Sequence, residues 1–175
     1  MLTKNFYNWV MANLTKREIT NGYVTPDGKV YNAVRSTQPI SYMWEHMDYL
    51  VIDNAPTNYL YVGVRIGTGV TPATADDYTL ESVINSGLSV VNPQDVTVTR
   101  ENDFVAVYAT YTVTNNGTTA VAISEIGLFC AGVYTSSTMV PILADRTVLE
   151  SPITINPGEA KPITYTIRFN YPTEV

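Results

Sequence analysis

Turn signals divide most of this chain into short β-favouring runs, and their spacing constrains the fold more than any other feature. Pro26-Asp27-Gly28, Asn115-Asn116-Gly117 and Asn156-Pro157-Gly158 each separate two runs rich in Val, Ile, Thr and Tyr. Pro fixes φ near the value that turns use, Asn and Asp bond to nearby backbone, and Gly accepts a positive φ. Strands that recur at spacings of about ten residues predict an antiparallel β-sandwich or barrel-like domain.

The expected strands cover much of the chain after residue 58. They are residues 59–66, 96–100, 104–114, 121–129, 139–143, 147–149, 153–155 and 163–169. We expect hairpins at residues 23–31, 115–118 and 156–159, and a short capped helical turn over residues 76–84 that Gly87 closes. The almost continuous apolar character from Ile123 to Cys130 predicts a central strand in which Phe129 is buried.

The first residues show a different periodicity. Leu2, Phe6, Trp9, Val10 and Leu14 follow one another at spacings of three and four, which is typical of one face of a helix. Thr3 suits the N-cap position. We therefore expect a helical arm over residues 1–20, followed by a single β-sandwich-like domain over residues 21–175. The arm either docks Phe6 and Trp9 onto a neighbouring subunit or packs on its own core.

A second aromatic stretch, residues 40–50, also has two interpretations. It contains Tyr42, Trp44 and Tyr49 together with two methionines. Aromatic residues and Met are enriched where proteins contact one another, so these three aromatic residues are interface candidates. Such stripes also pack into the cores of their own domains. The same stretch holds His46, the only histidine of the chain, which is more typical of a structural than of a catalytic residue.

The composition favours protein partners over nucleic acid or membrane. Charged residues make up 15% of the chain, against about 25% in typical soluble domains, and Thr, Ser, Asn and Tyr supply the polarity. We therefore expect a homo-oligomer. The net charge of −6 and the lack of a basic run disfavour phosphate binding. No apolar stretch approaches the roughly 18 residues of a membrane span, and the N-terminus lacks a signal-peptide core, so synthesis in the cytoplasm is expected.

No set of residues in the sequence indicates an active site, a cofactor site or a metal site. The lone Cys130 lies in an apolar run and is expected to pack as a small hydrophobe. Gly67-Thr68-Gly69 lacks the later Gly and the Lys of a phosphate loop, so it reads as a turn that ends a strand. Asp76-Asp77 fits a helix N-cap better than a calcium site. We therefore predict no catalytic residues, no cofactor and no enzymatic activity.

Three segments together carry a resemblance to a known group of proteins. They are residues 64–81, with Gly67-Thr68-Gly69 and Leu80-Glu81; residues 123–129, with Glu125-Ile126-Gly127-Leu128-Phe129; and residues 143–149, with Ala144-Asp145-Arg146. This pattern resembles small virion proteins of tailed bacteriophages and the attachment domains of tail-collar fibres. The chain departs from the collar-fibre pattern after Phe129, where Cys130-Ala131-Gly132-Val133-Tyr134 replaces a Gly-rich, Asp-bearing turn.

The resemblance implies a structural protein of the virion, located in the collar, the tail or on the capsid, and made in the host cytoplasm. Its partners would be copies of itself and other virion proteins. The alternative is a carbohydrate-binding or adhesion β-sandwich module, in which Tyr and Trp side chains stack on sugar rings. Assembly on purification would favour the first function, and a monomer retained on polysaccharide would favour the second.

Overall fold

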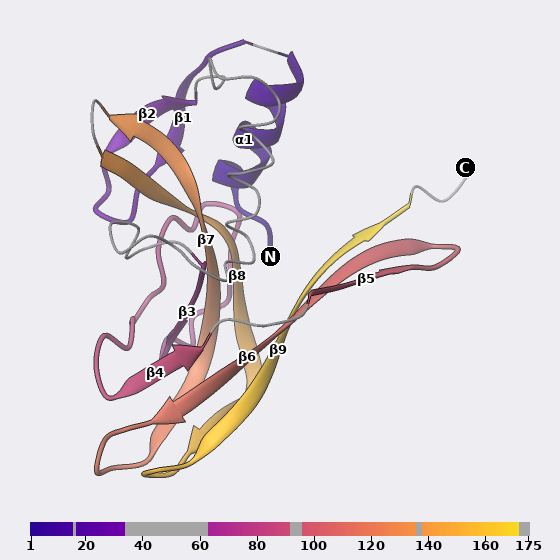
Figure 1. Ribbon diagram of the computed structural model, residues 1–175. Coiled ribbons are helices and arrows are strands. Elements are labelled where there is room, and N and C mark those ends of the chain that lie inside the picture. The colour runs from indigo at the N-terminus through magenta and orange to yellow at the C-terminus, as the bar shows by residue number, and fades with distance from the viewer. Residues whose placement is uncertain (16, 34–62, 92–95, 136–137, 172–175) are drawn as a thin grey trace. The chain divides into compact units, whose positions relative to one another are not determined.

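The computed structural model describes residues 1–15, 17–33, 63–91, 96–135 and 138–171. It confirms the predicted fold class: the described residues are mainly β, with one short helix and antiparallel sheets, consistent with a β-sandwich-like domain (Figure 1). The described strands fall into two compact units. Of the described residues, unit 1 contains 1–15, 17–33, 63–85, 122–135 and 138–154, and unit 2 contains 86–91, 96–121 and 155–171.

Unit 1 contains a three-stranded sheet with β7 at its centre. The strand order is β3 (Gly63–Gly67), β7 (Val121–Thr135) and β8 (Thr138–Ile155). β3 and β7 are antiparallel, with Ile66 opposite Ile126 and Gly63 opposite Phe129. Every residue from Ile123 to Phe129 is buried, because this central strand is covered on both faces. The prediction of a central strand with a buried Phe129 is confirmed.

The N-terminal helix α1 (Lys4–Thr15) packs on its own chain, beside the hairpin of β1 (Ile19–Val24) and β2 (Val30–Ala33). Ala12 of the helix is fully buried with Tyr23, Ala33 and Ile142 of unit 1. The Asn5 side chain accepts a hydrogen bond from the Val24 amide at 2.9 Å and donates one to the Val24 carbonyl at 2.8 Å. Self-packing, one of the two predicted roles of this segment, is therefore what the structure contains.

The predicted capping and turn chemistry holds at both ends of this N-terminal region. The Thr3 hydroxyl accepts a hydrogen bond from the Phe6 amide at 3.5 Å, as an N-cap does, and it donates to the Leu143 carbonyl at 2.6 Å. At the β1–β2 turn, Gly28 has a φ of 77°, which the absence of a Cβ permits. The predicted boundary near residue 20, between an arm and a single β domain, stays a prediction.

Unit 2 is a four-stranded antiparallel sheet in which β6 (Phe104–Asn115) is the common partner. Along one edge, β9 (Ala160–Asn170) pairs with β6 over its full length, from Phe104 opposite Asn170 to Thr114 opposite Ala160. Along the other edge, β4 (Leu88–Val91) and β5 (Val96–Arg100) pair with successive parts of β6. Figure 1 shows β5, β6 and β9 running side by side as three ribbons.

Two of the three predicted hairpins are wrong, for one reason. The segments at residues 115–118 and 156–159 are turns, and Gly158 has the expected positive φ of 74°. However, β6 and β7 lie in different sheets, and so do β8 and β9. Each turn therefore carries the chain from one sheet to the other instead of joining paired neighbours. Local turn chemistry specifies a reversal, whereas the partner of each strand depends on distant residues.

Three further predictions need correction or fall outside the description. The segment 76–84 contains no helical turn; it is irregular, with an isolated bridge between Gly67 and Val83, because its backbone amides bond to a buried carboxylate. The three short strands expected at 139–143, 147–149 and 153–155 are parts of one strand, β8. The interface candidates Tyr42, Trp44 and Tyr49, together with His46, lie outside the described residues.

Candidate functional site

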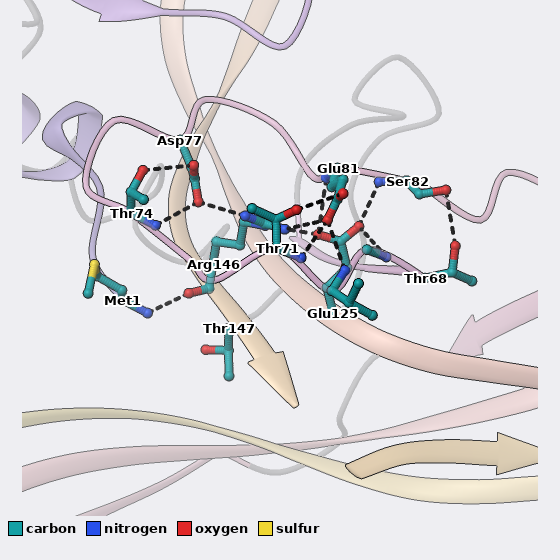
Figure 2. A network of polar contacts seen from close by, with 12 residues as sticks. Met1, Thr68, Thr71, Thr74, Asp77, Glu81, Ser82, Glu125, Arg146 and Thr147 are labelled. Atoms are coloured by element: carbon teal, nitrogen blue, oxygen red, sulfur yellow. Dashed lines mark hydrogen bonds and ion pairs between the residues drawn. The ribbon is translucent and has the colours of Figure 1, made fainter. Parts of the chain in front are cut away.

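The carboxylate of Glu125, in unit 1, is fully buried and takes part in a network of polar contacts (Figure 2). Glu125 belongs to β7, in the middle of an otherwise mostly apolar run. Its Oε1 accepts hydrogen bonds from the amides of Gly69 at 3.1 Å and Ser82 at 2.7 Å. Its Oε2 accepts from the Glu81 amide at 3.1 Å and from Nε of Arg146 at 2.9 Å. Each oxygen thus has two donors, which offsets the cost of burying the charge.

The cation in this cluster is Arg146 of β8, whose side chain is only 3% exposed. Besides Glu125, its guanidinium binds Asp77 through Nη1 at 2.9 Å and Glu81 through Nη2 at 3.5 Å. The planar fork of an arginine can bind several carboxylates in this way, which a lysine ammonium does less well. We call Arg146, Glu125, Asp77 and Glu81 the arginine network.

The two outer acids of the network are also bound to their own loop. Asp77 accepts hydrogen bonds from the amide and the hydroxyl of Thr74, both at 2.9 Å. Burial acts to raise the pKa of Asp77, but the hydrogen bonds from Thr74 and Arg146 outweigh it and hold that pKa below its ordinary value. The Thr71 amide and hydroxyl, and then the Val70 amide, lower the pKa of Glu81. Both carboxylates are therefore held in their charged form.

Gly67 and Gly69 give the Glu125 carboxylate the room that it needs. A Cβ at Gly67 would clash with Oε1 of Glu125 and lie 2.5 Å from the Ser82 carbonyl oxygen. At Gly69 a Cβ would lie 2.6 Å from the same Oε1 and 2.5 Å from Cβ of Glu81. The Gly-Thr-Gly sequence ends strand β3, as predicted. Both positions are glycine because the backbone at each of them passes close to the buried carboxylate of Glu125.

Beside the arginine network, an apolar contact joins Leu80 of the loop over residues 67–84 to Gly127 of strand β7. A Cβ at Gly127 would lie 2.7 Å from Cδ2 of Leu80 and 3.0 Å from Cδ1 of Leu143, so a glycine here lets Leu80 reach the sheet. Leu80, Phe129 and Leu143 form one buried cluster. The three segments that carry the phage-protein resemblance thus meet at one place in the fold. Glu125 and Arg146 both belong to the sequence pattern of the resemblance, but the sequence alone indicates no role for either residue.

The chemistry of the arginine network is that of a clamp. The carboxylate of Glu125 accepts four hydrogen bonds from its own chain, which fill its acceptor sites. It therefore has no free lone pair with which to bind a substrate or accept a proton. Residues 67–84 are fastened to the sheet by the same bonds. Among the described residues, no group of three or more His, Cys, Asp or Glu side chains is arranged to hold a metal ion; the guanidinium of Arg146 lies among the three acids instead.

A second feature, on unit 2, is an apolar sheet face whose burial ends halfway along β9. Ile163 and Tyr165 are each 6% exposed, whereas Phe169 on the same face is 41% exposed. Tyr171 lies two residues further on and is 45% exposed. Its amide donates to the Asp103 carbonyl at 2.8 Å, so the ladder continues and side-chain alternation places Tyr171 on this face.

Neighbouring strands extend this exposed half of the face. The pairing register places Val107 opposite Ile167 on one side and opposite Val98 on the other, and it places Val105 opposite Phe169. Val98 is 55% exposed, and Val105, Val107 and Ile167 are half-buried. We call the following residues the apolar patch: Val98, Val105, Val107, Ile167, Phe169 and Tyr171. In the sequence, the apolar alternation from Ile163 to Tyr171 is the signal that corresponds to this patch.

The opposite face of the same strands is polar. Thr110 and Thr164 lie opposite each other and their hydroxyls are 2.9 Å apart. Arg168 lies over the ring of Phe104, with its guanidinium carbon 3.8 Å from the ring centroid. Thr97, Thr112 and Thr166 are exposed on this face. A sheet with one hydroxyl-rich face and one apolar face is amphipathic, so the apolar patch is a property of one side only.

Of the predicted interface residues, the structure describes Phe6 and Trp9. Phe6 and Trp9 both lie on α1 and their rings stack with centroids 6.3 Å apart. Trp9 packs against the core cluster of unit 1. Contact of either ring with a neighbouring subunit stays a prediction. Cys130 packs against the same cluster, and burial raises the pKa of its thiol to about 12, which keeps it protonated at neutral pH.

Comparison of the chain with protein-family models, with curated proteins and with solved structures gave no match. In the part of the chain that the structure describes, no helix combines the length and the apolar character that crossing a membrane requires. Any functional assignment therefore depends on the residues and their arrangement.

Proposed function

We propose that this chain is a non-enzymatic structural subunit of a tailed-phage virion, which assembles through contacts with copies of itself and with other virion proteins. The observation that carries the proposal is the apolar patch. Soluble proteins expose single apolar side chains commonly, but a contiguous patch that contains two aromatic rings is typical of a surface that binds protein. The low charged fraction, 15% of residues, supports the same conclusion.

The arginine network is a second observation that supports the proposal. It holds residues 67–84 firmly on the sheet without leaving a reactive group free, which suits a rigid building block. It also links the three segments that resemble tail-collar and small virion proteins, so the resemblance involves residues that contact one another. Synthesis in the host cytoplasm and a place in the collar, tail or capsid surface belong to the same proposal.

The test is detection of the chain in particles. Phages produced from the genome that encodes it would be purified by density gradient, washed at high salt and treated with nuclease. We expect the chain to remain at a fixed ratio to the major capsid protein, as judged by quantitative mass spectrometry. A chain that stays in the soluble fraction while intact particles lack it would contradict the proposal.

A second experiment, on the free chain, tests the carbohydrate-binding alternative, for which the hydroxyl-rich face with Thr110, Thr164 and the partly exposed Tyr108 is the candidate surface. Affinity electrophoresis in gels that contain host surface polysaccharide would retard a glycan-binding module. Retardation of the free chain, combined with its absence from particles, would favour the alternative.

A further inference from the structure

We propose that the apolar patch is a self-association surface, through which two copies of this chain pair face to face. This inference rests on the proposed assembly function and names the first partner as a second copy. It concerns Val98, Val107, Ile167, Phe169 and their neighbours in unit 2, and it does not involve α1 or residues 40–50.

The first argument is that the apolar pattern of β9 continues beyond the buried part of the sheet. Alternate residues from Ile163 to Tyr171 are all apolar or aromatic, although exposure rises from 6% at Tyr165 to 41% at Phe169. Apolar side chains on the partly exposed end of a strand gain stability when a further apolar surface covers them. The intervening positions Thr164, Thr166 and Arg168 are exposed and polar. The pattern therefore fits a sheet whose apolar face is completed by another apolar surface.

The second argument is the charge of the surface around the patch, which selects the partner. The tip of these strands carries Arg100, which lies opposite Val105 on the patch face, and the acidic Glu101. It also carries Arg168 of the opposite face, which pairs with Asp103 at 3.4 Å, so the net charge of these four residues is zero. The chain as a whole has a net charge of −6, which the remaining residues must therefore carry. Two copies repel each other least when they approach by this end.

Charges of both signs at one tip are also complementary to the same tip of a second copy. Arg100 and Glu101 are both exposed neighbours in sequence, so a two-fold contact can place each beside its opposite. Isologous pairing of this kind is the commonest arrangement of soluble homo-oligomers. A strongly charged partner would find no matching field here.

The third argument is the available area. Phe and Tyr side chains bury about 150–250 Å² each when fully covered, so rings that are 41% and 45% exposed offer roughly 130–220 Å² together. With Val98, Val105, Val107 and Ile167, the patch supplies the apolar centre of an interface. The polar tip would form the rim of this interface. The lower end of stable interfaces requires each copy to bury about 600 Å².

The experiment uses two adjacent positions of β5 that lie on opposite faces and are both exposed. Val98→Asp puts a charge on the apolar patch, and Thr97→Asp puts the same charge on the hydroxyl-rich face. Sedimentation velocity and light scattering of the full chain would give the mass over a range of concentrations. We expect a species with twice the mass of the 19.3 kDa chain for the unmodified protein and for T97D. V98D should weaken the dimer about tenfold or more, since an unpaired charge would be buried.

A crosslinking measurement keeps the test independent of folding defects. Val98→Cys should form a crosslinked dimer with a short bis-maleimide, whereas Thr97→Cys should not; native Cys130 packs in the core, and the unmodified chain serves as the blank. A monomeric unmodified chain at high concentration, or equal behaviour of V98D and T97D, would overturn the self-association surface. If the chain is nevertheless found in particles, only this inference fails; absence from particles is the failure of the proposed function.

Discussion

Glu125 illustrates how a single buried charge can determine the residues around it. Its two oxygens take hydrogen bonds from three backbone amides and one guanidinium, and two glycines are needed because any side chain at their positions would collide with it or its neighbours. A buried ion pair contributes little net stability compared with apolar residues of the same shape. Removing only one partner of such a pair is costly, because the other charge then remains buried without a countercharge.

Glu125→Gln should therefore destabilise the protein by about 3–5 kcal/mol, the range measured when one partner of a buried pair is lost. The glutamine side chain would remove the fully buried negative charge beside Arg146. Its NH₂ group would also face the backbone N–H groups that now donate to the carboxylate. Urea denaturation at neutral pH measures the change. Glu101→Gln, at an exposed turn position, is the control and should change stability by less than about 0.5 kcal/mol. Similar losses for both variants would refute the clamp.

Phe129→Ala tests the core beside the network. The ring is fully buried with Leu80 and Leu143, and its deletion should cost about 3–5 kcal/mol through lost transfer free energy and the cavity left behind. Thermal unfolding followed by circular dichroism gives the value. A loss below about 1 kcal/mol, the level of surface positions, would mean that the ring is not part of the core.

At the scale of elements, α1 depends on the hairpin beside it. The helix has Asn5, Asn8 and Asn13 in a stretch of only 12 residues, and a helix this short is marginal alone in water. Two of these asparagines have a tertiary role: Asn5 bonds to Val24, and Asn8 donates to the Gly22 carbonyl at 2.7 Å. Residues that weaken the isolated helix thus attach it to β1.

Asn5→Ala should destabilise the protein by about 1–3 kcal/mol, because the Val24 amide and carbonyl would lose their partner in a largely buried position. The matched control is Tyr7→Ala on the same helix, where the side chain is 54% exposed. Hydrogen exchange at the Val24 amide provides a local readout and should become faster only in N5A. An unchanged stability in N5A would return the helix to the role of a separable docking arm.

At the scale of the whole molecule, the charged groups of the arginine network link stability to pH. The pKa values of Asp77 and Glu81 lie below their ordinary values of 3.8 and 4.5 in the folded protein. A carboxylate with a depressed folded pKa binds its proton more readily in the unfolded chain. Its contribution is therefore complete above the ordinary value and is lost as the pH falls through the folded pKa.

We expect the free energy of unfolding to fall as the pH is lowered from about 5 toward 3. Urea titrations across this range measure the slope. Asp77→Asn should lower stability at neutral pH and flatten the acid limb, because the substituted side chain no longer titrates. A slope in D77N that equals that of the unmodified protein would show that other acids cause the acid sensitivity.

The sequence by itself determined the fold class, the N-terminal helix, its Thr3 cap, the β1–β2 turn and the buried central strand with Phe129. These features depend on local chemistry and periodicity: a turn needs Gly28, a cap needs a hydroxyl, and a strand buried on both faces reads as a nearly continuous apolar run. The alternation that produces the apolar patch was also present in the sequence of β9.

Only the tertiary structure decided which strands pair and where the arginine network forms. The turns after β6 and β8 look like hairpin turns, but each leads to another sheet, because strand pairing is set by contacts between residues far apart in the chain. Residues 76–84 carry the local signals of a helical turn, but the amides of Glu81 and Ser82 instead donate to the carboxylate of Glu125, more than forty positions away. A charged residue inside an apolar run marks a buried partner, but its identity, here Arg146, follows from the three-dimensional arrangement alone.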